Sequence, residues 1–139
     1  MAAAVVVDAA AVLSLTLREP GRAFVVAAMD QWQSARVALH APTLMPYEWA
    51  SGVAKALARG TLGMEDVASA RDAIVSLGIT YHAVDPVAAV GIARALQRRS
   101  AYDAAYLALA AELGAQLWTL DGPLYGNAVA SGFDVRLFA

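Results

Sequence analysis

SAYDAAYLALAAELGAQLWTLD, residues 100–121, contains a helix, a buried strand and two aspartates in close succession. Apolar residues that recur at steps of three and four predict a helix with one buried face, formed by Tyr102, Tyr106, Leu109 and Leu113. This helix is expected to end at Gly114. The continuous apolar run 115–120 predicts a short strand covered on both faces. Asp121 follows this strand at its carboxyl end, where open α/β sheets bind their ligands.

The rest of the chain alternates between predicted strands and predicted helices. The apolar run 2–7 before Asp8 predicts a central parallel strand. Further strands are predicted at 38–41, 78–84 and 133–138, and helices at 9–17, 22–37, 64–77, 86–97 and 124–130, with another helix opened by Pro42 and Pro46. We therefore expect one domain over residues 1–139, a three-layer α/β/α fold with a central, mainly parallel sheet.

The composition excludes several classes of site. The sequence has no cysteine, which rules out disulfides, thiolate zinc sites and cysteine nucleophiles. The hydrophobic fraction of 60% is high, and its excess is mostly alanine. No uncharged run exceeds about twelve residues, whereas a membrane span needs roughly twenty. The first charge is Asp8, with no basic segment or cleavage pattern before it, so we expect a cytoplasmic protein without a membrane segment. A net charge of −2 gives no broad basic field for nucleic acid.

Four acidic residues occupy positions that a three-layer α/β fold brings to one rim. Asp8 and Asp121 follow predicted strands, whereas Glu48 and Asp103 lie in the first turns of predicted helices. Carboxylates crowded together repel one another unless a hard divalent cation compensates them. The pattern therefore favours a site for Mg²⁺ or Mn²⁺, and phosphodiester hydrolysis is the chemistry that such a site supports.

Each acid also has a structural explanation. Asp8 suits a helix N-cap, and Asp121, followed by Gly122 and Pro123, suits a turn. Ser100 and Asp103 fit a capping box.

Glu48 lies on a polar stripe with Lys55 and Arg59, which is typical of a solvated helix face. The same helix has a predicted apolar stripe: Tyr47, Ala50, Ala54 and Leu57.

Basic, aromatic and histidine residues allow further predictions. Arg98 and Arg99 either complement the end of a helix or contact phosphate beside Asp103. Trp32 and Trp49 are expected in the core or at an interface. His40 and His82 lie far apart in the sequence and are interpreted as structural residues rather than zinc ligands.

Three segments of the sequence together resemble the PIN-domain ribonucleases, in particular the VapC toxins of bacterial toxin–antitoxin pairs. They are VVVDAAAVLSL (5–15), APTLMPYEWASGVAKALARG (41–60) and residues 100–121. The resemblance covers nearly the whole chain. Its most specific part is a Y-D-A-x-Y-L-A-L-A helix followed by a T-x-D strand end. Members of this family are metal-dependent endoribonucleases. The resemblance therefore implies that the substrate is RNA, that a cognate antitoxin is the partner and that the protein forms a homodimer.

The resemblance also assigns roles to individual residues. Asp8, Glu48, Asp103 and Asp121 match the acidic site that holds Mg²⁺ or Mn²⁺, and Thr119 matches the small hydroxyl residue before the last acid. Asp8 and Asp103 would hold the principal ion, with Glu48 completing its shell and Asp121 positioning a second ion or the attacking water. The RNA-backbone candidates are Lys55, Arg59, Arg98 and Arg99. The chain departs from the family at Ala10 and Gly122, where hydroxyl or amide and basic residues are common.

Two other classes of function remain open from the sequence. One is a PIN-like binding module that has lost catalysis. The other is a phosphotransfer domain using strand-end aspartates, but Ala10 stands where a phosphatase of this kind needs a second aspartate, and Lys55 is the only lysine available to a receiver domain. A nucleotide-binding P-loop is excluded because no G-K-[ST] motif occurs.

Overall fold

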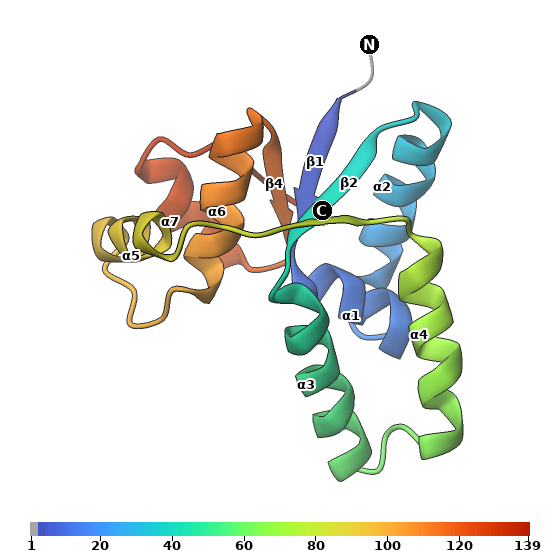
Figure 1. Cartoon of the computed structure of the whole chain (residues 1–139). Helices are drawn as coiled ribbons and strands as arrows, with labels where there is room; N and C mark the ends of the chain where they lie inside the picture. The colour runs from blue at the N-terminus through green and yellow to red at the C-terminus, as the bar shows by residue number, and fades with distance from the viewer. Residues whose placement is uncertain (1–2) are drawn as a thin grey trace.

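The first strand of the chain is the central strand of the sheet. In the computed structural model, which describes residues 3–139, β1 (Ala4–Val7) pairs with β2 on one side and with β4 on the other. The strand order is β3-β2-β1-β4-β5, and every pairing is parallel, as Figure 1 shows in part. The other strands are β2 (Ala38–Pro42), β3 (Thr80–His82), β4 (Gln116–Thr119) and β5 (Val135–Leu137). Val6 and Val7 are fully buried, as expected of a strand covered on both faces.

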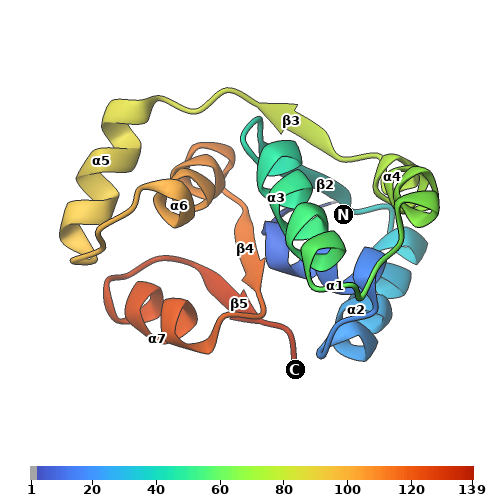
Figure 2. The same cartoon turned by 90° about the horizontal axis from the view of Figure 1, so that it is seen from below.

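Helices cover both faces of this sheet, so the predicted three-layer α/β/α architecture is confirmed. One layer contains α1 (Ala9–Leu17), α2 (Arg22–Ser34), α3 (Met45–Ala58) and α4 (Val67–Ser76), the last preceded by the short 3₁₀ helix η1 (Met64–Asp66). The other contains α5 (Pro86–Ala95), α6 (Tyr102–Leu113) and α7 (Gly122–Ala130), with α5 outside α6 (Figure 2). The change of face follows from right-handed crossovers, because the chain moves outward from β1 to β3 and then returns to β4.

The apolar face of α6 was only partly predicted. Tyr106 and Leu109 are buried, and the helix packs against β1, β2 and β4. Tyr102, in the first turn, is 63% exposed. The prediction that Tyr102 belongs to the buried face is therefore wrong.

The predicted apolar stripe of α3 is also wrong. The helix buries Met45, Trp49, Val53 and Ala56, whereas Tyr47 is 79% exposed. Trp49 decides this orientation because its large ring is 9% exposed and its Nε1 donates a hydrogen bond of 3.1 Å to Thr16 Oγ1 of α1. Small alanines on the predicted stripe offer much less apolar area to bury.

Trp32 confirms the prediction of a core position. Its ring lies 5.2 Å from that of Trp118 and 5.9 Å from that of Phe138, between centroids, so α2 is packed against the β4–β5 side of the sheet.

The observed strands are shorter than predicted at β3 and β5, and Ala2 of the first predicted strand lies outside the described residues. None of the helices within residues 3–139 has the length and apolarity needed to cross a bilayer.

His40 and His82 are neighbours in space. Nδ1 of His40 and Nε2 of His82 are 2.8 Å apart, which joins β2 to the edge strand β3. Burial, and next the His82 ring, lower the pKa of His40 below its ordinary value of 6.5. The sequence distance between the two residues concealed this contact.

Candidate active site

The acidic residues lie at the carboxyl rim of the sheet, around the point where the strand order reverses. From β1 the chain proceeds to β2, and from β4 it proceeds to β5 in the opposite direction. In open α/β sheets a divergence of this kind marks the place where ligands usually bind, here the ends of β1 and β4. Asp8 follows β1 as the N-cap of α1, and Asp121 follows β4 as the N-cap of α7.

Asp8 is held by hydrogen bonds to both carboxylate oxygens. Its Oδ1 accepts from the Ala11 amide at 2.9 Å, and its Oδ2 accepts from Thr119 Oγ1 at 2.5 Å. The side chain is buried, and burial raises the pKa of Asp8 to about 6, against the opposing effect of the two hydrogen bonds. The charges of Asp103 and Asp121 raise it further. Asp8 is thus both the cap predicted from its position and a perturbed acid in a crowded site.

Thr119 connects the two strand-end aspartates. Its side chain is fully buried, its hydroxyl donates to Asp8, and the same oxygen accepts from the Asp121 amide at 3.0 Å. Asp121 in turn accepts from the Leu124 amide through Oδ1 at 3.0 Å. The hydroxyl therefore fixes the Asp8 carboxylate relative to the end of β4.

Glu48 has a partner that the sequence reading did not identify. The Tyr106 hydroxyl, on α6, donates a hydrogen bond of 2.6 Å to Glu48 Oε1 on α3. Burial raises the pKa of Glu48, the bond from Tyr106 opposes this, and the charge of Asp103 adds to it. The sequence placed Tyr106 on an apolar face, but a buried tyrosine usually needs a hydrogen-bond partner, which was the available signal.

Asp103 forms an ion pair instead of the predicted capping box. The N-cap of α6 is Ala101, which makes no side-chain cap bond, and Ser100 Oγ accepts from the Tyr102 amide. Asp103 Oδ2 instead lies 3.0 Å from Arg98 Nη1. Burial raises the pKa of Asp103, the Arg98 charge lowers it, and the Asp121 charge raises it.

The loop that carries Arg98 is fixed where it leaves α5. Gln97 adopts a left-handed conformation with φ of 56°, and the Arg98 amide donates to Ala93 at 2.8 Å, which closes α5. Asn127 of α7 donates to the Leu96 carbonyl at 3.0 Å. These contacts, which sequence reasoning missed, position Arg98 over Asp103.

The remaining basic candidates are spread more widely. Lys55 lines one hollow together with Glu48, whereas Arg59 lines another with Leu17 and Leu62. Arg99 is exposed in the loop before α6. The structure thus brings Arg98 and Lys55, but not Arg59, to the acidic residues.

The four acidic side chains carry the oxygen donors that Mg²⁺ and Mn²⁺ prefer, but they are not gathered into a cage. Within residues 3–139, no three histidine or acidic side chains converge closely enough to hold one metal ion. Each of the four acids is instead engaged by a donor of the protein. Mg²⁺ commonly takes only one or two carboxylates and keeps several waters, so a site of this kind needs fewer direct ligands.

The fold has a counterpart among solved structures. The chain is similar to the crystal structure of PAE2754 from Pyrobaculum aerophilum, with a TM-score of 0.65 and 24% sequence identity over 91% of this chain and 87% of that one. At this identity the similarity supports the three-layer fold alone. No family model and no curated protein matches the sequence.

Proposed function

We propose that this protein is a metal-dependent endoribonuclease of the PIN-domain, VapC-like kind, the toxin of a toxin–antitoxin pair. The observation that carries the proposal is that acids from distant parts of the sequence meet at one rim: Thr119 joins Asp8 to Asp121, and Tyr106 of α6 holds Glu48. Burial raises the pKa of Asp8 and of Glu48, and the charge of Asp103 adds to both shifts. Such mutual repulsion destabilises the fold and is typical of sites that bind a cation.

The proposal gives each acidic residue a task. Asp8 and Asp103 would hold the principal Mg²⁺ or Mn²⁺, Glu48 would complete its shell, and Asp121 would orient the attacking water or a second ion. A bound ion of this type supplies an acidified water and stabilises charge on the phosphoryl oxygens.

Neighbouring residues would orient these acids. Thr119 keeps the Asp8 carboxylate in place, and Tyr106 keeps that of Glu48 in place. Arg98 neutralises Asp103 in this structure and is close enough to the acids to contact a phosphate of the RNA.

The test is cleavage of single-stranded RNA by the purified protein with Mn²⁺. Asp8→Asn and Asp103→Asn should each lower the rate by at least about a hundredfold, since each removes a ligand charge. Asp85→Asn is the matched control, because Asp85 is also the N-cap of a helix, that of α5, but is exposed and distant in sequence from the four acids. Equal rates for the wild type and the two site variants would contradict the proposal.

The toxin assignment adds partners that can be tested separately. A homodimer in the cytoplasm, inhibited by a small antitoxin, is what the resemblance implies. Expression of the protein alone should arrest growth. The product of an adjacent small open reading frame, when co-expressed, should relieve this arrest and co-purify with the protein. Growth arrest that persists in the presence of that product would remove the toxin–antitoxin part while leaving the nuclease part standing.

A noncatalytic binding module is the second candidate. It is favoured by the fact that no three possible ligands converge within residues 3–139. Calorimetric titration with Mn²⁺ separates the two, because a binding module without a metal site should give no heat of binding and no RNA cleavage.

A further inference from the structure

Two strongly exposed tyrosines directly precede two of the acidic residues. Tyr47 comes before Glu48 in the first turn of α3 and is 79% exposed. Tyr102 comes before Asp103 in the first turn of α6 and is 63% exposed. Each ring therefore stands in solvent one residue from a carboxylate, although burying an aromatic ring is favourable.

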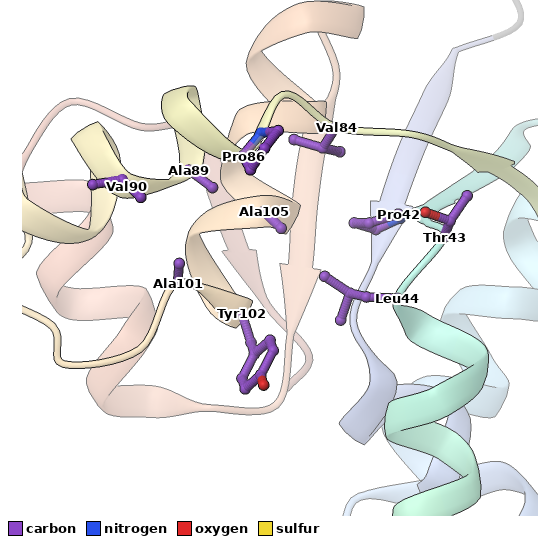
Figure 3. A pocket seen from close by; sticks show the side chains of 10 residues that line it. All are labelled: Pro42, Thr43, Leu44, Val84, Pro86, Ala89, Val90, Ala101, Tyr102 and Ala105. Carbon is purple, nitrogen blue, oxygen red and sulfur yellow. The ribbon is translucent and has the colours of Figure 1, made fainter.

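Both rings line the same groove. The groove has a volume of about 500 Å³, and its walls include Tyr47, Glu48 and Lys55 from α3 and Tyr102 from α6. Leu44 and Tyr102 also line an adjoining apolar pocket of about 260 Å³ between the β2–α3 turn and α5–α6. Figure 3 shows this pocket, with the Tyr102 ring below it on the side that faces α3.

We infer that Tyr47 and Tyr102 are stacking platforms for unpaired nucleobases, so that the groove takes a single RNA strand with its bases on the two rings. The inference rests on the proposed nuclease function and adds residues that hold the substrate. Unpaired bases stack on aromatic side chains with little dependence on sequence. Because both tyrosines line the same groove as Glu48, the bases they hold would belong to nucleotides near the bond that is cut.

The charges in the groove fit a nucleic-acid strand. Lys55, the only lysine of the sequence, lies two helical turns beyond Glu48 on α3 and is exposed in the same groove. A cation at this position suits a backbone phosphate. Ser51 adds a hydroxyl to the same wall. The remaining lining is small or apolar, apart from Glu48: Ala9, Ala10, Leu13, Leu44 and Gly52. The mixture of rings, cation and hydroxyl nevertheless suits a strand of nucleotides better than the apolar face of a protein helix, which needs a continuous apolar surface.

The test measures binding separately from cleavage. Fluorescence anisotropy with a labelled oligoadenylate in EDTA, where a metal-dependent nuclease cannot cut, should give an affinity that Tyr47→Ala and Tyr102→Ala each weaken about 5- to 100-fold. Tyr47→Trp and Tyr102→Trp should retain it, since a larger ring still stacks. Phe24→Ala is the matched control, because Phe24 is also an exposed aromatic residue, at 53%, but lies on α2 outside the groove.

The outcomes separate this inference from the proposed function. Alanine variants that bind and cut RNA as the wild type does would overturn the stacking role and leave the nuclease standing. Binding that depends on both tyrosines, in a protein that never cuts RNA with Mn²⁺, would support the platforms and reject the nuclease. If the wild type fails to bind the oligonucleotide, the inference is wrong and the groove is left to a protein partner.

Discussion

The buried carboxylate of Asp8 lowers the stability of the folded protein at neutral pH. Burial raises the pKa of this carboxyl from 3.8 to about 6, so keeping it ionised at neutral pH costs on the order of 3 kcal/mol of folding free energy. Between these two pH values the folded protein holds a proton that the unfolded chain has released. Stability from this residue therefore falls as the pH rises through that window and stays low above it.

Asp8→Asn should consequently stabilise the protein at neutral pH by about 1–3 kcal/mol. The amide oxygen can accept from Ala11 and the amide nitrogen can donate to Thr119 Oγ1, but the buried Thr119 hydroxyl then loses Asp8 as its acceptor, which offsets part of the gain. Urea unfolding at neutral pH and near pH 4 measures the effect, and the advantage of the variant should vanish at the lower pH. A variant less stable than wild type at both pH values would show that Asp8 serves the fold instead.

At the scale of elements, the contact between α1 and α3 depends on a glycine. A Cβ added at Gly52 would stand 2.6 Å from Leu13 Cδ1 and Cδ2, closer than carbon atoms can approach. At Gly91, within α5, an added Cβ would meet nothing within 4 Å. The two helical glycines thus differ in their surroundings.

This contrast predicts opposite effects of the same substitution. Gly52→Ala should destabilise by about 1–3 kcal/mol because it overpacks the α1–α3 contact, whereas Gly91→Ala should stabilise by about 0.5–1 kcal/mol through helix propensity. Denaturant midpoints measure both, and Leu13→Val should partly restore Gly52→Ala. Equal effects of the two substitutions would mean that the contact is loose.

The β2–β3 pairing should respond to acid through its histidines. Because the folded state lowers the pKa of His40 below 6.5, the unfolded chain binds more protons there, and stability is lost as the pH falls from 6.5 through the folded pKa. His40→Gln should remove this loss while keeping a hydrogen bond to His82. Unfolding is best compared in an Asp8→Asn background, since Asp8 acts with the opposite sign. An unchanged acid sensitivity in His40→Gln would assign the effect to other groups.

At the scale of the whole molecule, the sequence predicts the succession of strands and helices better than it predicts which side chains meet. Strand ends followed by Asp8 and Asp121 identified the carboxyl rim, because apolar runs and their terminating acids are local features. The partners Tyr106 of Glu48 and Arg98 of Asp103 depend on how helices are rotated and how a loop closes, which local periodicity does not define. The predicted rotation of α3 was wrong for the same reason, because Met45, Trp49 and Val53 together bury more apolar area than the predicted stripe with its two alanines.

Metal binding should stabilise the molecule as a whole. A ligand that binds the folded state alone adds about 2.7 kcal/mol at a hundred times its Kd, and it also removes part of the repulsion among the acids. Thermal unfolding with increasing Mn²⁺ should therefore show a rising midpoint in the wild type and a much smaller rise in Asp103→Asn. Midpoints that do not move with Mn²⁺ would argue against a metal site.

The bond from Thr119 to Asp8 joins residues 111 positions apart, which has a consequence for biosynthesis. A nascent polypeptide leaves the ribosome amino-terminus first, so Asp8 emerges long before β4 can pair with β1. We expect the acidic arrangement to form only after β4, with Thr119, has left the ribosome. If the protein cuts RNA as proposed, it would then be harmless to the message and ribosome producing it until that strand has emerged.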